Sequence, residues 1–230
     1  MSSVSTSPVN ALKMEQLGYV IANEVIFKNL SQHFLPGISV IMGPNGAGKS
    51  TLLRLLSRIS LPTTGKITLS NKNDSYEKCR IGYVPAVPCL YPYLSVRENF
   101  ILIATLQGCA PEAALTGLAN QHLDRYQHCI FARLSDGIQK RVTIASQLIA
   151  QPRLLILDEP CNALDPYARQ QLFEQLAQLR TPERFIIFSS HHPQECYPWC
   201  DNLYLLLGGK LECCEKIPQS ALKPLAIAES

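Results

Sequence analysis

The chain has 230 residues, of which 47% are hydrophobic and 17% are charged, so its composition is that of a folded protein and excludes wholesale disorder. Lysine and arginine number 21 and the acidic residues 18, and the net charge of +3 is too small to indicate nucleic acid or an anionic membrane as the main partner. The longest apolar stretches, such as 100–105, fall far short of the roughly 18 to 20 residues that cross a bilayer.

The N-terminal residues 1–10 do not resemble a secretory signal, because they are rich in serine and lack both a basic start and an apolar segment. We therefore expect the chain to stay in the cytoplasm. The 9 cysteines form no paired CxxC set, and we expect reduced thiols rather than a disulfide framework or a zinc site.

Strand and helix signals alternate along most of the chain. In chain order they predict strands at 19–26 and 38–42, a helix at 52–59, strands at 66–69 and 81–84 with a polar loop at 71–74 between them, helices at 96–106 and 111–126, a strand at 154–157, a helix capped by Asp165, and strands at 185–188 and 203–207. No strand signal occurs between 95 and 132. A helical subdomain therefore interrupts an α/β core.

The glycine-rich segment between the second predicted strand and the first predicted helix fits the phosphate-binding pattern GxxxxGK[ST]. Its candidate ATP-binding residues are Gly43, Pro44, Asn45, Gly46, Ala47, Gly48, Lys49, Ser50 and Thr51. Glycines let successive backbone N–H groups point at phosphate oxygens, and the helix N-terminus adds a favourable dipole. In this motif Lys49 reaches the β and γ phosphates and the Ser50 hydroxyl is a ligand for Mg²⁺.

An acidic pair follows the apolar strand predicted at 154–157. In a parallel sheet this places Asp158 and Glu159 at the carboxyl end of a buried strand, beside the phosphate loop. Asp158 is the candidate for holding Mg²⁺, and Glu159 is the candidate for polarising or deprotonating an attacking water. An Asp-Glu pair after a strand is by itself more often a solvated helix start, so its significance comes from the phosphate loop.

In order and approximate spacing, the segments 43–51, 134–141, 154–160, 163–165 and 190–191 resemble the motifs of the ATP-binding cassette (ABC) ATPases. The resemblance implies a P-loop NTPase (RecA-like) α/β core with an N-terminal antiparallel β region and an inserted helical subdomain. The implied boundaries are a flexible N-terminus at 1–13, the core at 14–94 and 140–212, a helical subdomain at 95–139 that ends in the signature motif, and a C-terminal tail at 213–230.

The resemblance also implies roles for residues outside the phosphate loop. The segment 134–141 is similar to the family signature LSGGQxxR, which acts in trans across a head-to-tail dimer; Ser135 and Gly137 would contact the γ phosphate held by the other subunit. His191 matches the switch histidine, which would contact the γ phosphate and orient the water. Asp165 matches the last position of the dimer-contact loop. Both Ser135 and Asp165 are equally suited to cap a helix.

The implied function is an ATP-binding and ATP-hydrolysing subunit that powers an ABC transporter, with ATP and Mg²⁺ as cofactors. Its short helical insert and its signature are more similar to export-type or heme-exporter-type subunits than to those of nutrient importers. The implied partners are a separate transmembrane permease and a second ABC ATPase subunit, identical or closely homologous, and no nucleic acid is expected. The chain would then lie on the cytoplasmic face of the membrane.

Two departures from the family pattern keep alternatives open. The segment 81–86 resembles the family loop that ends in glutamine, but the last position is Ala86, whose methyl group can neither bind Mg²⁺ nor hydrogen-bond water. Asp136 replaces the first signature glycine, and a carboxylate there would repel a phosphate unless it turns outward. The alternatives are a degenerate cassette that binds ATP structurally and hydrolyses it weakly, and a soluble ABC ATPase without a transport role.

Overall fold

The computed structural model of the protein describes residues 10–70, 75–162, 164–191 and 193–214. The tails at 1–9 and 215–230, the predicted polar loop at 71–74 and Ala163 of the predicted dimer-contact loop lie outside the described residues. The strands are β1 (Leu12–Ile21), β2 (Glu24–Phe34), β3 (Gly37–Met42), β4 (Thr64–Leu69), β5 (Ile81–Val84), β6 (Leu154–Leu157), β7 (Phe185–Ser190), β8 (Asn202–Leu207) and β9 (Lys210–Cys213). The α-helices are α1 (Lys49–Leu56), α2 (Val96–Leu106), α3 (Pro111–Asn120), α4 (Asp136–Leu148), α5 (Pro166–Gln178) and α6 (Pro193–Cys196).

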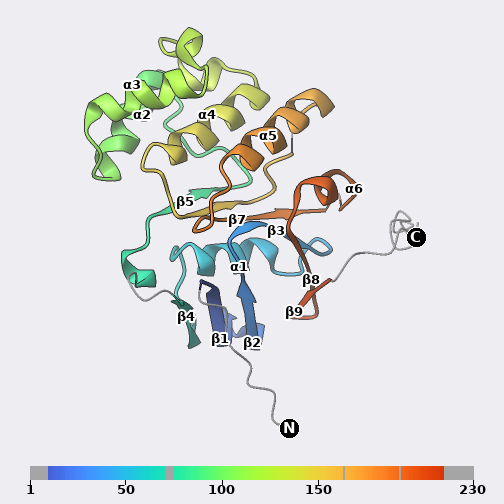
Figure 1. Cartoon of the computed structure of the whole chain (residues 1–230). Helices are drawn as coiled ribbons and strands as arrows, with labels where there is room; N and C mark the ends of the chain where they lie inside the picture. The colour runs from blue at the N-terminus through green and yellow to red at the C-terminus, as the bar shows by residue number, and fades with distance from the viewer. Residues whose placement is uncertain (1–9, 71–74, 163, 192, 215–230) are drawn as a thin grey trace.

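The larger sheet holds the strands in the order β5-β6-β7-β3-β8-β9, and neighbouring strands are parallel except β8 and β9. Every residue of β3, β6 and β7 is buried, as expected for strands covered on both faces. α1 covers one face and α5 the other (Figure 1). Because parallel strands run in one direction, their carboxyl ends meet at one edge, where ligands bind in sheets of this type.

The smaller, antiparallel sheet shows that the first predicted strand is wrong. β1 lies between β2 and β4, and the chain reverses between β1 and β2 at Ala22 and Asn23, inside the strand predicted at 19–26. Both turn residues have positive φ angles, 45° and 68°, which a tight hairpin turn requires. β1 also begins at Leu12, within the stretch that the sequence assigned to the flexible N-terminus.

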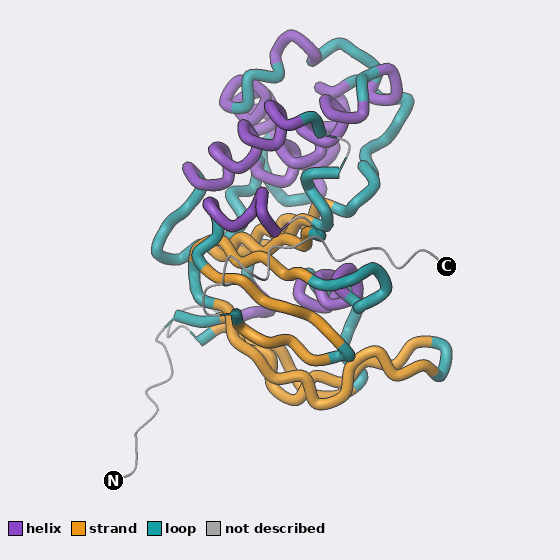
Figure 2. The backbone as a smooth tube through the Cα atoms, turned by 90° about the vertical axis from the view of Figure 1, so that its right-hand side faces the viewer, coloured by secondary structure: helices purple, strands orange, loops and turns teal. Residues whose placement is uncertain are grey.

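Each helix predicted from the sequence is present; the one predicted at 96–106 coincides with α2, and two others differ in their boundaries. α1 begins at Lys49, so the helix predicted at 52–59 is placed about one turn late. The helix predicted at 111–126 ends at Asn120, and a separate 3₁₀ turn covers Asp124–Tyr126. α2, α3 and α4 form the helical subdomain, which lies at one end of the molecule (Figure 1, and turned by 90° in Figure 2). This subdomain has an apolar core of its own. Among the described residues, no helix combines the length and apolar character that crossing a membrane requires.

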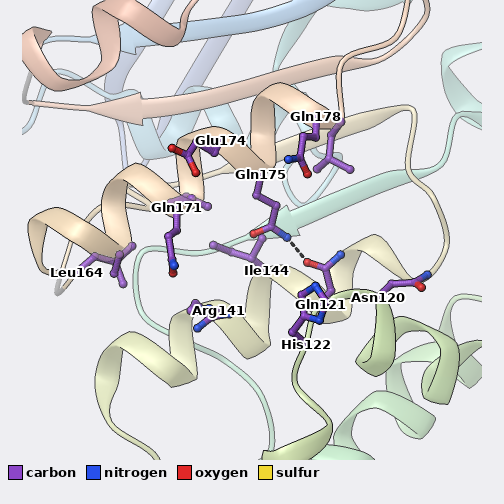
Figure 3. Close-up of a pocket in the computed structure, with 13 residues that line it drawn as sticks. Asn120, Gln121, His122, Arg141, Ile144, Leu164, Gln171, Glu174, Gln175 and Gln178 are labelled. Carbon is purple, nitrogen blue, oxygen red and sulfur yellow. Dashed lines mark hydrogen bonds between the residues drawn. The ribbon is translucent and has the colours of Figure 1, made fainter.

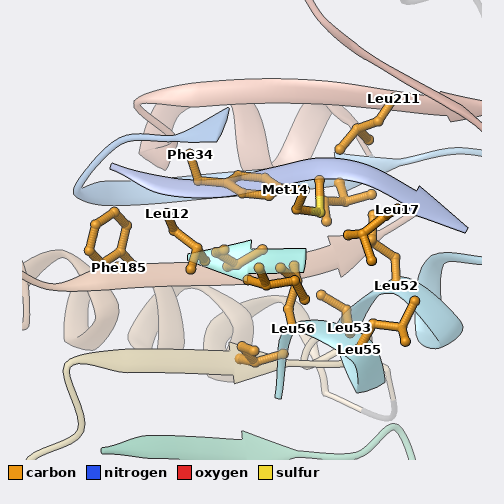
Figure 4. Close-up of a cluster of buried hydrophobic side chains, with 14 of the residues drawn as sticks. Leu12, Met14, Leu17, Phe34, Leu52, Leu53, Leu55, Leu56, Phe185 and Leu211 are labelled. Atoms are coloured by element: carbon orange, nitrogen blue, oxygen red, sulfur yellow. The ribbon is translucent and has the colours of Figure 1, made fainter. Parts of the chain in front are cut away.

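The phosphate loop is anchored by the helix that follows it. α1 lies between the two sheets, so one side packs on β3, β6 and β7 and the other on side chains of β1 such as Leu12, Met14 and Leu17 (Figure 4). The α1 side chains in this cluster are Leu52, Leu53, Leu55 and Leu56, each at most 1% exposed. Burying one leucine contributes about 1.5–3 kcal/mol. The start of α1, and with it the loop, is therefore held in a fixed position.

Candidate nucleotide-binding site

The phosphate loop connects β3 to α1, and two of its glycines are required by the backbone and by close packing. Gly48 has a φ of 94°, a left-handed conformation that favours glycine, and a Cβ there would lie 3.1 Å from the Phe27 ring. A Cβ on Gly43 would collide with the carbonyl oxygen of Leu206. The loop is thus seated against β2 and β8, and a side chain at either position would displace it.

Lys49 is the first residue of α1 and reaches back into the loop. It is 5% exposed, and its Nζ donates to the carbonyl oxygens of Gly43 at 2.8 Å and Pro44 at 3.0 Å. An ammonium group carries three donors, so these bonds fix its position while a third donor remains for a phosphate oxygen. The N-terminal N–H groups of α1 add partial positive charge. Ser50, the next residue, is exposed at this helix start.

A hydroxyl group on β7 holds the two acidic residues that follow β6. Ser189 Oγ donates to Asp158 Oδ1 at 2.7 Å and accepts the backbone N–H of Glu159 at 2.9 Å. Asp158 is 3% exposed and Ser189 is fully buried, so this hydrogen bond compensates part of the cost of removing a carboxylate from water. The two acidic residues are therefore positioned by the strand next to their own.

Glu159 is held in a backbone conformation that residues other than glycine rarely adopt. Its φ is 45°, and keeping such a conformation costs about 1–3 kcal/mol. Both carboxylate oxygens have neighbours: Asn162 Nδ2 donates to Oε2, and His191 Nδ1 lies 3.5 Å from Oε1. Strained residues of this kind concentrate at functional sites, and these contacts orient the Glu159 side chain.

The phosphate loop and Glu159 line one pocket of about 300 Å³. Its lining residues are Asn45, Gly46, Gly48, Lys49, Ser50, Thr51 and Glu159. Gly43, Pro44 and Ala47 complete the loop. The structure therefore brings the predicted ATP-binding residues together with the predicted catalytic residues Glu159 and His191, and it places Asp158 directly before Glu159 at the end of β6.

The oxygen donors of Ser50, which lines this pocket, and of Asp158, which directly precedes the lining residue Glu159, fit a magnesium nucleotide. The Ser50 hydroxyl and the Asp158 carboxylate are hard oxygen ligands, and Mg²⁺ typically takes one or two carboxylates and completes its shell with water and substrate phosphates. Among the residues that the structure describes, no group of three or more His, Cys, Asp or Glu side chains could hold a metal ion.

The remaining predicted site residues gather in a separate place, which we call the signature groove. Ser135, Gly137 and Asp165 line this groove of about 810 Å³, and none of the phosphate-loop residues does. Asp165 caps α5, with the Ala168 N–H donating to Oδ1 at 2.9 Å, which confirms the predicted cap. Ser135 stands at the N-cap position of α4 but makes no capping hydrogen bond with its side chain. Asp136 is exposed.

A cleft of about 340 Å³ lies between α5 and the helical subdomain and shares Arg141 with the signature groove. Figure 3 shows the side chains of Gln121 and Gln175 meeting across it, where Gln175 Nε2 donates to Gln121 Oε1. α4 connects the two sides, because Val142 belongs to the core of the helical subdomain and Ile144 to the core beneath α5. The helix that begins with the signature motif therefore packs both in the helical subdomain and in the core beneath α5.

Sequence reasoning missed the residues that position the acidic pair. Asn162 stands three places after Glu159, the spacing of a turn, and this local signal could have suggested the contact. Ser189 comes from a different strand, and its contact with Asp158 depends on the pairing of β6 with β7. Lys140, within the signature segment, is also buried against the site.

We expect Ser189→Ala to lower both stability and the affinity for a magnesium nucleotide. The change leaves the buried Asp158 without this donor and the Glu159 N–H without this acceptor, which should reduce the free energy of unfolding by about 1–3 kcal/mol. Loss of a residue that orients metal ligands typically reduces metal affinity about 10- to 100-fold. Ser146→Ala is the matched control, since Ser146 is equally buried but donates to Thr143 within α4. Equal affinities for MgATP in the two variants would contradict the positioning role.

The fold and the site together define a class: an α/β protein with a phosphate loop, built to bind a nucleoside triphosphate. Residues 27–162 match the protein family described as ABC transporter. The chain belongs to this family and carries its ATP-binding domain. The family and the α/β P-loop fold predicted from the sequence are confirmed.

Relatives and solved structures agree with this assignment. A Nod factor export ATP-binding protein I from Rhizobium etli is 32% identical over 211 residues, which cover 88% of this chain and 67% of that protein. A protein of the same name from Burkholderia pseudomallei is 31% identical over 235 residues, covering 98% and 75%. A solved ATP binding subunit of an ABC transporter superposes with a TM-score of 0.78 at 23% identity, over 93% of this chain and 94% of that one, and shows the shared fold.

Proposed function

We propose that this chain is an ATP-hydrolysing subunit that powers an ABC transporter, in the direction of export. The main observation in support of this proposal is that Lys49, Ser50 and Glu159 line the same pocket. A phosphate-binding loop with an oriented carboxylate beside it is the arrangement that hydrolysis of a nucleoside triphosphate requires. The export direction is supported by the names of the relatives, which are export ATP-binding proteins.

In the proposed reaction, water attacks the γ phosphorus of ATP while Glu159 accepts a proton from that water, the bond from the γ phosphorus to the β–γ bridging oxygen breaks, and ADP and phosphate leave. The carboxylate is already oriented by Asn162 and His191, so little reorganisation accompanies the reaction. His191 would also contact the γ phosphate. Mg²⁺, held by Ser50 and Asp158, would neutralise charge on the phosphates when bound.

The separation of the signature groove from the phosphate loop supports a dimer as the active form. Ser135 and Gly137 line a groove that contains none of the loop residues, so within one chain they stand apart from the pocket lined by the loop and Glu159. In a head-to-tail pair, the groove of one cassette would cover the nucleotide of the other, with Asp165 at the contact. The second cassette would be an identical chain or a close homologue.

The pore would be supplied by a separate transmembrane permease, with this chain on the cytoplasmic face of the membrane. The described helices include none that could cross a bilayer, and the net charge of +3 does not favour nucleic acid as the partner. Tagged chain purified from its native membranes in mild detergent should carry a multi-span membrane protein and hydrolyse ATP faster than the isolated chain. Recovery with RNA or ribosomes instead would support the soluble, non-transport alternative.

A second candidate, a cassette that binds ATP and hydrolyses it weakly, is favoured by Ala86. This residue is exposed directly after β5 and Pro85, and its methyl group offers no donor or acceptor to a metal-bound water. We expect Ala86→Gln to raise the ATPase rate by about threefold or more, because the amide adds an oriented polar group. Val87→Gln, at a neighbouring position that is 77% exposed, is the control. An unchanged rate in Ala86→Gln would show that alanine is tolerated there.

A further inference from the structure

Lys140 is a buried cation that joins three segments of the site. It lies in the second turn of α4 and is 2% exposed. Its Nζ donates to the carbonyl oxygens of Pro85 and Ala86, each at 3.0 Å, and lies 3.5 Å from the carbonyl oxygen of Asp158. One side chain thus connects the signature helix, the loop after β5 and the end of β6.

Removing an ammonium group from water costs free energy, so Lys140 needs these partners to remain charged in this position. Burial lowers the pKa of Lys140 from 10.5 to about 8, and the carboxylates of Asp158 and Glu159 act in the opposite direction. A buried charge is tolerated when its donors are used and opposite charge lies nearby. Both conditions hold here, since carbonyl oxygens accept from Nζ and the two carboxylates lie within electrostatic reach.

The carbonyl partners explain how the loop after β5 is held without a polar side chain of its own. Ala86 cannot hydrogen-bond through its methyl group, but its backbone oxygen is bound by Lys140. The Asp158 N–H donates to the Val84 carbonyl at 2.8 Å, so β5 and the acidic pair are already adjacent. Lys140 extends this connection by two residues along the loop. The loop therefore cannot move away from Asp158 without removing a partner from a buried charge.

We propose that Lys140 is a positioning residue for ATP hydrolysis, which holds the loop after β5 against the end of β6 and so keeps Asp158 and Glu159 in place. The proposal rests on the proposed function, because it assigns the positioning to the ATPase reaction of the same pocket. Since α4 begins in the signature groove, Lys140 also gives the signature helix a direct connection to the acidic pair. A shift of about 1 Å at such a site is enough to reduce turnover strongly.

The test compares three variants of the full chain with wild type and with Glu159→Gln. Lys140→Met removes the charge and all the donors, Lys140→Arg retains a charged donor, and Val142→Ala trims a side chain that is fully buried in the same helix but packs in the helical subdomain. For each we would measure thermal stability, kcat and KM for MgATP, and hydrogen exchange of the amides in the 86–92 segment.

We expect Lys140→Met to lower kcat about tenfold or more with KM within about twofold of wild type, and to speed exchange in the loop after β5. Lys140→Arg should recover at least part of kcat, while Val142→Ala should lower stability and leave kcat close to wild type. A kcat within twofold of wild type in folded Lys140→Met would overturn the proposal. If Lys140→Met does not fold, Lys140→Leu, which also lacks a donor, replaces it, and a wild-type kcat there has the same meaning. Failure of the proposed function would give a different result, because wild type would then hydrolyse ATP no faster than Glu159→Gln.

Discussion

Glu159→Gln should lower the steady-state rate of phosphate release by about 100- to 10,000-fold, the range expected when a general base is removed. Glutamine has nearly the same shape as glutamate, and its carbonyl oxygen can still accept the hydrogen bond from Asn162. The backbone N–H would still donate to Ser189. The loss should therefore be confined to the proton-accepting step, so that kcat falls while the affinity for MgATP changes little.

Phosphate release and equilibrium binding of ATP, measured on the same preparation, separate these two effects. Glu15→Gln is the control for the chemical change, because Glu15 pairs with Lys66 at 3.0 Å on the small sheet, away from the pocket. If binding persists while hydrolysis is blocked, light scattering should also detect ATP-dependent dimers in the variant. Equal hydrolysis rates for wild type and Glu159→Gln would exclude Glu159 as the base and favour the weakly active alternative.

The parts of the site that the sequence predicted are those encoded by local spacing. The phosphate loop, from Gly43 to Thr51, is one continuous segment between a strand and a helix, so its residues and their neighbours follow from the motif alone. Asp158 and Glu159 also come directly after a buried strand. Where several functional groups lie on one short segment at the edge of a parallel sheet, the sequence is sufficient to place them.

Contacts between segments that lie far apart in the sequence could not be predicted in the same way. Lys140 binds the carbonyl oxygens of Pro85 and Ala86, and every residue has such an oxygen, so no partner type appears in the sequence. Ser189 reaches Asp158 only because β7 pairs with β6. Both contacts depend on sheet order and helix position, which are properties of the whole fold.

The error at the first hairpin has a different cause. The turn at Ala22 and Asn23 contains no glycine or proline, so apolar residues on both sides read as one continuous strand. Farther back, Gln16 has a φ of 50°, and the pairing of β1 shifts between Met14 and Leu17. A bulge of this kind interrupts the alternation of buried and exposed residues by which strands are recognised. The sequence pattern therefore did not indicate that β1 begins at Leu12.

Lys49→Ala should remove most of the affinity for ATP. In wild type the Nζ atom is fixed by the carbonyls of Gly43 and Pro44, so its charge is directed at the phosphates without further ordering. A charge-assisted hydrogen bond contributes about 1.5–3 kcal/mol, so loss of the one such bond that Nζ has left for a phosphate oxygen corresponds to a roughly 10- to 150-fold increase in Kd. Lys66→Ala, an exposed lysine on the small sheet, controls for the loss of one positive charge.

Thermal unfolding with and without MgATP measures this effect in the folded chain. A ligand that binds only the native state stabilises it by an amount that grows with the logarithm of 1 + [L]/Kd. MgATP at a concentration near the wild-type Kd should therefore raise the melting temperature of wild type and Lys66→Ala, whereas Lys49→Ala should show little or no shift at the same concentration. Lys49→Ala should also unfold at a lower temperature without nucleotide, because the carbonyls of Gly43 and Pro44 lose their donor. If Lys49→Ala were stabilised by MgATP as much as wild type, the phosphate loop would not be the site of nucleotide binding, and the proposed hydrolysis, dimerisation and transport would lose their common basis.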